Sequence, residues 1–476
     1  MNPLWACILL PQLALDGVMR QRVEPAEPLV LLGGPPQRRV LQAVNPAARA
    51  LGLKPGQLLS AAQALTRGFA SADYDLAAIE RWQQFLAAWA YGFSAQVSLH
   101  YPRCLLLEVG SSLGLFGPWP RFEARLRREL GELGFQQRIT LAPNPVAARV
   151  LANVHDGLAI GDAAELHAAL EPLPVDRIGL PRETASALAR MGLRSLQQLL
   201  ALPRDGLARR FPAELLRHLD SLLGERALAL EFYRPPDRFD ARIELNFEVE
   251  SHQALLFPLR RLTTDLAAYL AGRDSGVQRF TLHLEHRNRP ASQLVVGLLS
   301  AERDPAMLLE LTRGRLEQLQ LPAPVLALRL EARELPAFAP QHRQLFEERP
   351  QQSLPWEQLR ERLRARLGDE AVQGLGVRAD HRPEQSWQAE SDRRTPPLPS
   401  VGPRPGWLLG EPQPLAEAGL LILAGPERIE SGWWDGGEQA GDVRRDYFVA
   451  LARDAAWLWI YRECRAGGWF LHGAFS

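Results

Sequence analysis

The sequence has few of the residues that mark a metalloprotein, a secreted protein or a membrane protein. It contains three cysteines, Cys7, Cys104 and Cys464, too widely spaced for a zinc cluster or a disulfide framework. No apolar run approaches the roughly 18 residues of a membrane-spanning helix, and the N-terminus lacks the basic segment of a signal peptide. These absences predict a cytoplasmic protein with no metal, no cofactor and no membrane partner.

An excess of charge of one sign is also absent. The chain has 55 basic and 55 acidic residues, so its formal net charge is zero, and the whole chain has no strong attraction to nucleic acid. Any DNA binding would depend on local basic faces. With 46% hydrophobic and 23% charged residues, the composition is typical of globular proteins. The length suffices for about three or four domains.

An apolar strand pattern followed by a small-residue turn lies at residues 101–117, YPRCLLLEVGSSLGLFG. Residues 104–109 are predicted to form a buried strand, because a short apolar run bounded by turn residues suits the centre of a sheet. Further strands are predicted at 5–10 and 137–141. Helical patterns occupy 76–91, 121–133 and 145–154. Strands and helices in this order predict an α+β layer fold.

This segment and the order of elements resemble the palm of Y-family translesion DNA polymerases. When residues 107–109, LEV, are placed on the family's Leu-Asp-Val, the family's metal-binding Asp-Glu pair falls on Arg103 and Cys104. Two-metal phosphoryl transfer needs carboxylates that hold two cations close together. An arginine has the wrong charge, and a thiol is a poor ligand for Mg²⁺. The resemblance therefore implies a site without catalytic residues and without metal.

The first strand leads to the same prediction. The family pattern Asp-x-Asp-x-Phe-Phe places Ala6 and Ile8 at the two aspartate positions. A shift of the alignment by a residue or two would not supply an acid, because the first carboxylate in the sequence is Asp16. All the expected acid positions in both strands thus carry other residues.

Two further segments resemble the nucleotide site of the family. Residues 39–65 resemble the fingers, where Arg49 is retained as a residual phosphate ligand but Pro46 replaces a tyrosine. A surface arginine on a helix is an equal alternative for Arg49. Residues 139–156 resemble the motif that contains Asn144 and Arg149, in which Pro145 replaces a lysine. Part of the phosphate-binding set is therefore predicted to remain.

The next two segments resemble the DNA-binding parts of the family. Residues 173–230 resemble the helix-hairpin-helix thumb, and Gly179 retains one hairpin glycine for weak binding to a DNA phosphate. A purely structural helix pair is an equal alternative. Residues 239–335 alternate strands and helices as in the little finger, the domain that lies in the major groove. Arg287 and Arg289 lie in a predicted hairpin turn, either solvated or in contact with phosphate.

Two short motifs after residue 335 resemble sliding-clamp-binding peptides, in which a glutamine precedes a leucine and an aromatic residue. The start of a helix is the alternative for the second motif. An amphipathic helix is predicted at 356–367, facing a partner, DNA or solvent. The clamp-binding candidates are Gln341, Leu345, Phe346, Gln351, Leu354 and Trp356.

Composition and resemblance divide the chain into five regions. They are a palm- and fingers-like region (1–172), a thumb-like region (173–235), a little-finger-like region (236–335), a linker with the clamp motifs (336–406) and a tryptophan-rich C-terminal region (407–476). The last region is predicted to form short strands, because its aromatic residues alternate.

This C-terminal region resembles the tail of one branch of the family, the ImuB-type proteins of bacterial mutagenesis cassettes. That resemblance implies a non-catalytic, polymerase-like scaffold in SOS-induced translesion synthesis and DNA repair. The implied partners are DNA, the sliding clamp (β subunit), an error-prone DnaE-type polymerase α subunit and a RecA-like ImuA-type protein. The first alternative is an active translesion DNA polymerase. The second is a DNA-binding protein or enzyme unrelated to replication.

Overall fold

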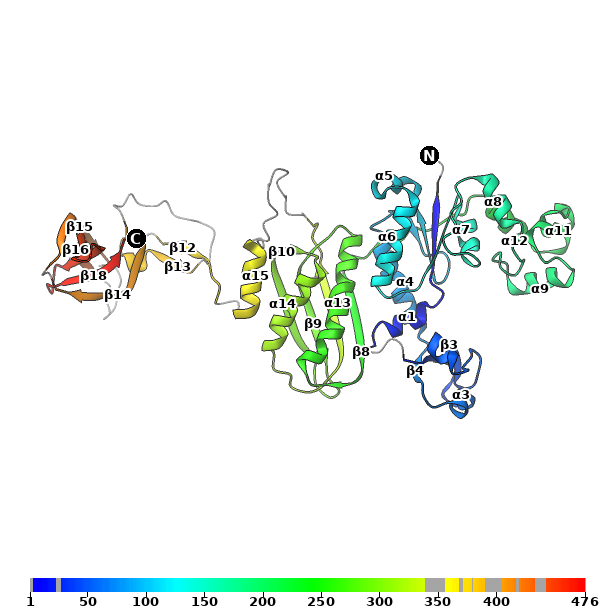
Figure 1. Ribbon diagram of the computed structural model, residues 1–476, viewed down its shortest axis with the longest axis horizontal. Helices are drawn as coiled ribbons and strands as arrows, with labels where there is room; N and C mark the ends of the chain where they lie inside the picture. The colour runs from blue at the N-terminus through cyan, green and yellow to red at the C-terminus, as the bar shows by residue number, and fades with distance from the viewer. Residues whose placement is uncertain are drawn as a thin grey trace. The chain divides into compact units, whose positions relative to one another are not determined.

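The computed structural model describes residues 3–22, 27–338, 356–367, 371–378, 380–389, 404–416, 419–432 and 442–475. The chain forms two compact units, Met1–Arg366 and Leu367–Ser476 (Figure 1). Among the helices of these described residues, none is long and apolar enough to cross a membrane.

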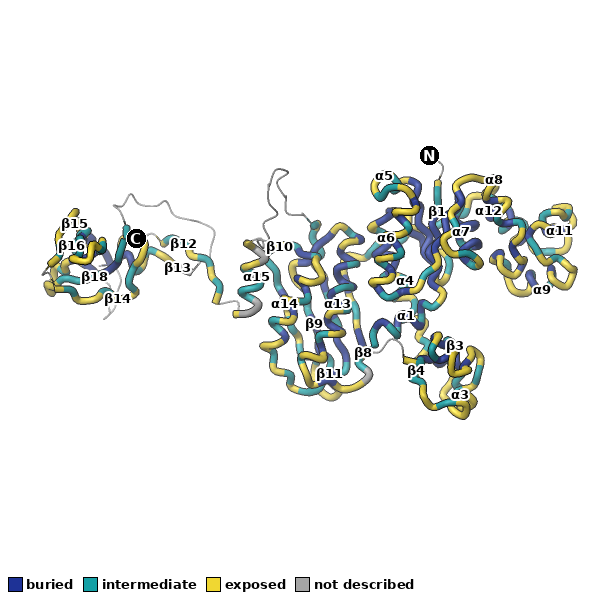
Figure 2. Tube along the Cα trace, in the orientation of Figure 1, coloured by how far each residue is buried: buried dark blue, intermediate teal, exposed yellow. Residues whose placement is uncertain are grey.

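The first unit contains a four-stranded antiparallel sheet of order β5-β6-β1-β7. Its strands are β1 (Trp5–Leu9), β5 (Val97–Ser98), β6 (Cys104–Glu108) and β7 (Arg138–Ala142). Every residue of β1 and β6 is buried, which explains the continuous apolar runs in the sequence (Figure 2). The predicted strands are confirmed to within a residue at their ends.

Helices cover both faces of this sheet. One face packs against α4 (Leu76–Ala90) and α6 (Trp119–Glu132), and the other against α7 (Pro145–Ala152). Each helix starts at a residue suited to that position: Asp75 and Asn144 accept backbone N–H groups, and Pro118 precedes α6. The α+β layer architecture predicted from the sequence is confirmed.

A small three-stranded sheet of order β3-β2-β4 forms the fingers-like part. Asn45 anchors it, because its side chain accepts the N–H groups of Leu29 and Ala48 and so joins β2 to the start of α2. The elements are α1 (Leu13–Met19), β2 (Leu29–Gly33), β3 (Val40–Val44), α2 (Pro46–Ala50), α3 (Leu59–Leu65) and β4 (Ala70–Asp73).

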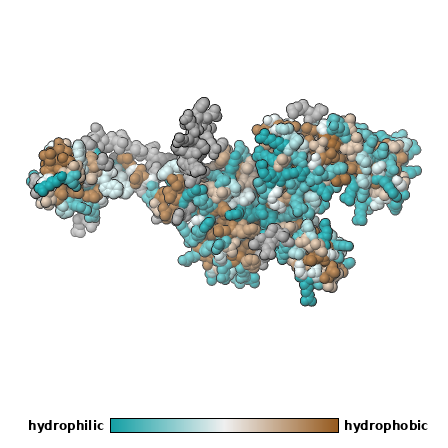
Figure 3. Space-filling model, viewed as in Figure 1, coloured by the Kyte–Doolittle hydropathy of each residue, from teal (hydrophilic) through white to brown (hydrophobic). Residues whose placement is uncertain are grey.

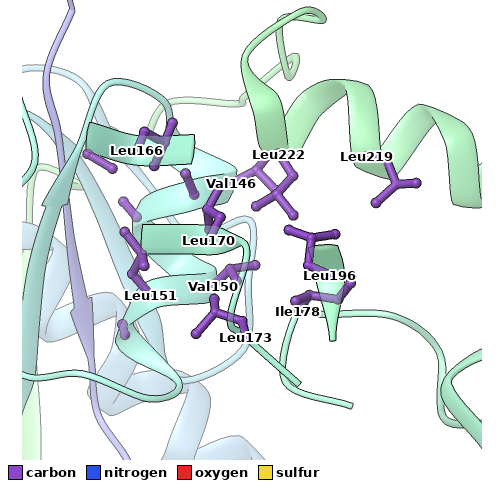
Figure 4. Close-up of a cluster of buried hydrophobic side chains, with 14 of the residues drawn as sticks. Val146, Val150, Leu151, Leu166, Leu170, Leu173, Ile178, Leu196, Leu219 and Leu222 are labelled. Carbon is purple, nitrogen blue, oxygen red and sulfur yellow. The ribbon is translucent and has the colours of Figure 1, made fainter. Parts of the chain in front are cut away.

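The thumb-like part is helical, as predicted. Its core is shared with the palm, since Val146 and Val150 of α7 lie in one buried cluster with Leu219 and Leu222 of α12 (Figure 4). Helix α8 (Ala163–Leu170) comes just before this part, whose helices are α9 (Arg182–Arg190), α10 (Leu196–Leu200), α11 (Arg204–Arg210) and α12 (Ala213–Leu223).

The little-finger-like part is a four-stranded antiparallel sheet of order β10-β9-β11-β8, with α13 and α14 packed against one face (Figure 1). The predicted alternation of strands and helices is confirmed here. The elements are β8 (Phe239–Val249), α13 (His252–Gly272), β9 (Val277–Glu285), β10 (Ser292–Glu302), α14 (Pro305–Gln318) and β11 (Val325–Glu334). Helix α15 (Trp356–Leu367) follows, and Arg362 pairs with Glu310 of α14 at 2.8 Å.

The second unit is built on a five-stranded antiparallel sheet of order β14-β18-β17-β16-β15. Its core is aromatic, with Tyr447 stacked on Trp459 at 4.2 Å between ring centroids. The strands are β14 (Trp407–Leu415), β15 (Leu421–Ser431), β16 (Val443–Leu451), β17 (Trp457–Glu463) and β18 (Trp469–Ala474). The prediction of a small aromatic sheet is confirmed.

Part of the segment assigned to a linker by its composition has regular structure. Strands β12 (Leu375–Val377) and β13 (Trp387–Ala389) pair with each other, and Glu384 between them binds Arg445 of the five-stranded sheet at 2.9 Å. A proline-rich composition alone does not reveal such an ion pair, because the partner lies 61 residues away in the sequence.

Candidate functional site

The sequence resemblance predicts two of the metal-binding acid positions at the β5–β6 hairpin, which turns beside the end of β1. Cys104 pairs with Leu9, and the N–H of Leu10 donates to the carbonyl of Arg103 at 2.9 Å. Arg103 has a φ of 54°, and its guanidinium is exposed and lies 3.4 Å from the Pro11 carbonyl oxygen. Leu9 and Leu10 therefore lie beside Cys104 and Arg103, so apolar side chains, a thiol and an arginine meet at this point.

The four residues expected at acid positions do not come together. Ala6 and Ile8 pair with Leu107 and Leu105, deeper in the sheet, and lie on the face covered by α4 and α6. Cys104 lies on the opposite face. The strand register thus places Leu9, Leu10 and Pro11 beside the hairpin, instead of the expected Ala6 and Ile8. The sequence alignment alone could not resolve this difference in register. None of these residues is acidic, so the prediction that β1 supplies no carboxylate is unchanged.

Cys104 and Cys7 form a buried thiol pair on adjacent strands. Their Sγ atoms are 3.3 Å apart, and both residues are completely buried. Burial raises the pKa of the Cys7 thiol well above its ordinary value, and the hydrogen bond with Cys104 raises it further. Both side chains therefore belong to the apolar core, and thiols are poor ligands for a hard divalent cation.

Two buried carboxylates of the palm-like part, Glu108 and Asp16, have structural partners. Glu108, at the far end of β6, accepts the N–H of Gly110 at 2.9 Å and the hydroxyl of Ser111 at 2.6 Å. Asp16 is buried and accepts the N–H of Gln136 at 2.8 Å. Among the residues that the structure describes, no group of three or more His, Cys, Asp or Glu side chains could hold a metal ion.

The candidate phosphate ligands Arg49 and Arg149 occupy different environments. Arg49 is exposed on α2. Arg149 is half-buried on α7, where it binds the side chain of Asn153 and lies over the Tyr101 ring at 5.8 Å. Asn144 caps α7 by accepting the Ala147 N–H. Arg49 is thus open to solvent, whereas Arg149 already has a side-chain partner.

Gly179 lies in the thumb hairpin with a φ of 89°, a conformation that favours glycine. Next to this hairpin is a surface cavity of about 620 Å³, whose lining includes Arg182, Arg194 and Asp176. The two arginines were not among the predicted ligands. In the sequence, these arginines are marked only by their positions. Arg182 begins the helix that follows the hairpin, and Arg194 comes shortly after that helix ends.

The remaining candidates lie beyond the thumb. Arg287 and Arg289 are exposed in the β9–β10 turn, and Arg287 pairs with Glu248 at 2.9 Å. Of the two clamp motifs, only Trp356 lies within the described residues, at the start of α15 with 63% of its surface exposed. The other clamp candidates, Gln341, Leu345, Phe346, Gln351 and Leu354, lie outside the described residues.

Two comparisons of sequence show which known proteins the chain is similar to. Residues 18–153 match the model of the impB/mucB/samB family. Two relatives, both Protein ImuB and from two strains of Caulobacter vibrioides, are 27% identical to the chain over 458 residues. The match covers 90% of this chain and 100% of each relative.

Two solved structures resemble the chain more distantly. DinB from Sulfolobus solfataricus is 14% identical, with a TM-score of 0.38 over 71% of this chain and 100% of that one. The insertion ternary complex of Dbh DNA polymerase is 15% identical, with a TM-score of 0.40 over 70% of this chain and 100% of that one.

The chain is thus similar to the ImuB proteins over nine-tenths of its length, and its residues 18–153 are similar to the impB/mucB/samB family.

Proposed function

We propose that the chain is a non-catalytic scaffold for translesion synthesis. It contacts damaged DNA through its polymerase-shaped first unit, binds the sliding clamp through residues 341–356, and recruits an error-prone DnaE-type polymerase α subunit and a RecA-like ImuA-type protein. Such a protein speeds lesion bypass by raising the local concentration of the polymerase that performs it.

The observation that carries this proposal is the β5–β6 hairpin beside the end of β1. Arg103, Cys104, Leu9 and Leu10 meet there, and none of them can hold Mg²⁺. The lack of a carboxylate among these four residues supports the proposal that the chain does not carry out two-metal nucleotide transfer. The fold of the palm is retained around it, so the same elements can still support binding.

Exposed apolar side chains on the second unit support a protein-binding role for that unit. Trp407 is 71% exposed, Trp457 53% and Leu421 61%. Strand pairing places Leu421, Leu451 and Trp457 side by side across β15, β16 and β17, and hydrophobic side chains gather on the visible face of this unit (Figure 3). Exposed tryptophans are effective anchors at protein interfaces.

Paired substitutions test the clamp contact. Leu345→Ala/Phe346→Ala removes the apolar residues of one motif, and Leu354→Ala/Trp356→Ala removes those of the other. We expect one double variant to weaken binding to the clamp at least tenfold, because each motif inserts two apolar side chains into a pocket. Each variant is the matched control for the other. Unchanged binding by both would contradict the proposed clamp site.

A further inference from the structure

The outer face of the little-finger-like sheet, opposite α13 and α14, carries charges in alternation. Residues that alternate with the buried core positions point to this face, including Asp240 and Arg242 on β8, Glu285 on β9, and Arg329 and Arg333 on β11. We call this set the outer sheet face. In the polymerases that the chain resembles, this domain lies against DNA, so the state of its arginines decides whether it can do so here.

Two arginines of the outer sheet face, Arg242 and Arg329, are held in ion pairs that cross strands. Arg242 reaches over β11 to Glu285, with its Nε 3.1 Å from both carboxylate oxygens and its Nη2 2.9 Å from Oε2. Arg329 binds Asp240 through two hydrogen bonds of 2.8 and 2.5 Å. Both contacts are bidentate, the geometry in which a guanidinium matches a carboxylate or a phosphate best.

Two further contacts complete the network. Arg333 binds Glu331 at 2.8 Å, and Arg242 also approaches Glu244 at 3.3 Å. The ion pairs of this face therefore use three arginines and four carboxylates. Hydrogen bonding to Arg242 lowers the pKa of Glu285, and hydrogen bonding to Arg333 lowers the pKa of Glu331, so these carboxylates stay ionised.

A DNA phosphate would meet this face at a disadvantage. It would have to displace a carboxylate that already occupies the fork of the arginine, and the displaced carboxylate would remain beside it with the same charge as the phosphate. Binding to the DNA backbone depends on basic side chains that neutralise phosphates and release counterions. Arginines already neutralised within the protein supply little of that free energy.

We propose that Asp240 and Glu285 are specificity-determining residues that keep duplex DNA off the outer sheet face. This inference rests on the proposed scaffold function, and it confines DNA contact to other parts of the first unit. The chain then depends on its protein partners, rather than on DNA binding by the little-finger-like part, to stay at a lesion.

The test measures whether a variant gains affinity for duplex DNA. Asp240→Asn/Glu285→Gln keeps the shape of both side chains and frees Arg329 and Arg242 on the outer sheet face. The matched control is Glu310→Gln/Glu317→Gln, which makes the same change of charge on α14 and frees Arg362 and Arg313 on the helical side. Binding of a fluorescent DNA duplex is measured over a range of salt concentrations, with melting temperatures to verify folding.

We expect the outer-face variant to bind duplex DNA about tenfold more tightly at low salt, with a salt dependence steeper by about two phosphate contacts. The control should bind like the wild-type chain. An equal gain by both variants, or no gain by the outer-face variant when its melting temperature is unchanged, would overturn the inference.

A second variant keeps the test independent of the first. If the outer sheet face leaves DNA alone, Arg242→Gln/Arg329→Gln should bind duplex DNA as the wild-type chain does. Weaker binding by several-fold would mean that the face already contacts DNA, and the inference would be wrong. Clamp binding, measured on the same samples, reports separately on the scaffold function.

Discussion

At the residue scale, Cys104 occupies a position where the sequence resemblance predicts a metal-binding acid, and this position belongs to the buried core. Its thiol contacts that of Cys7 at 3.3 Å and has no exposed surface. A carboxylate at this position would be buried beside apolar strands and a neutral thiol. An acidic side chain therefore does not suit this position.

Cys104→Glu tests that statement. We expect the substitution to lower the free energy of unfolding by more than about 2 kcal/mol, because it buries a polar group without a hydrogen-bond partner. Urea denaturation measures the change, and Cys104→Ala is the control for the loss of the thiol alone. A glutamate variant as stable as the alanine variant would mean that the site still accommodates a carboxylate.

Asp16 is a second buried acid, and it predicts a pH dependence of stability. Burial raises its pKa to about 6, although the N–H of Gln136 that it accepts acts in the opposite direction. In the unfolded chain an aspartate titrates near pH 3.9. The folded protein therefore holds the proton more tightly, and this contribution to stability is present below about pH 4 and is lost as the pH rises through 6.

Asp16→Asn removes that contribution while keeping a side-chain oxygen for Gln136. Relative to the variant, the wild-type chain should lose up to about 3 kcal/mol of unfolding free energy between pH 4 and pH 6.5. Chemical denaturation at several pH values measures the difference. A constant difference across this range would show that the pKa of Asp16 is not raised.

The register of β1 marks the limit of what the sequence could predict at this scale. The loss of acids was evident, because the first carboxylate in the chain is Asp16. The neighbours of Cys104 were not evident from the sequence. A shift of the alignment along a fully apolar strand leaves the same apolar pattern. Only the pairing of Leu9 with Cys104 identifies the residues that meet at the hairpin.

At the element scale, α13 joins the little-finger-like part to the palm. A Cβ on Gly272 would lie 2.0 Å from the carbonyl oxygen of Ala88 in α4, so the two helices touch at backbone distance. Arg20 of the palm side and Asp265 of α13 form a buried ion pair, with side chains 1% and 2% exposed. This contact between distant segments had no signal in the sequence, because both residues look like ordinary surface charges.

Gly272→Ala should therefore destabilise the first unit by about 1–3 kcal/mol, since the added methyl group overpacks the contact between α13 and α4. Gly131→Ala is the control, because a methyl group added to Gly131 in α6 would have nothing within 4 Å, and alanine is the better helix former. Thermal or urea unfolding compares the two variants. If both lose the same stability, the close approach of the helices does not contribute as described.

The elements themselves were largely predictable. Helix α15 has the bounds that its pattern predicted, Trp356–Leu367. Apolar periodicity carries that information locally. The short β12–β13 pair was not foreseen, because its attachment to the five-stranded sheet depends on Glu384 and Arg445, which are far apart in the sequence.

At the scale of the whole molecule, the two compact units suit the separate binding roles proposed for them. The first contains the palm-, fingers-, thumb- and little-finger-like parts, and the second presents exposed tryptophans on its five-stranded sheet. The sequence between α15 and the five-stranded sheet keeps them on one chain. Separate binding units on one chain raise each other's effective concentration at a common target.

Primer extension by the purified protein, with Mg²⁺ and with Mn²⁺, tests the central claim most directly. Clamp binding is measured on the same preparation, so that a lack of extension cannot be attributed to inactive protein. The account predicts no nucleotide addition with either metal while clamp binding persists. Metal-dependent addition that survives stringent purification would contradict it, because carboxylates would then have to hold the metals at a position other than the β5–β6 hairpin.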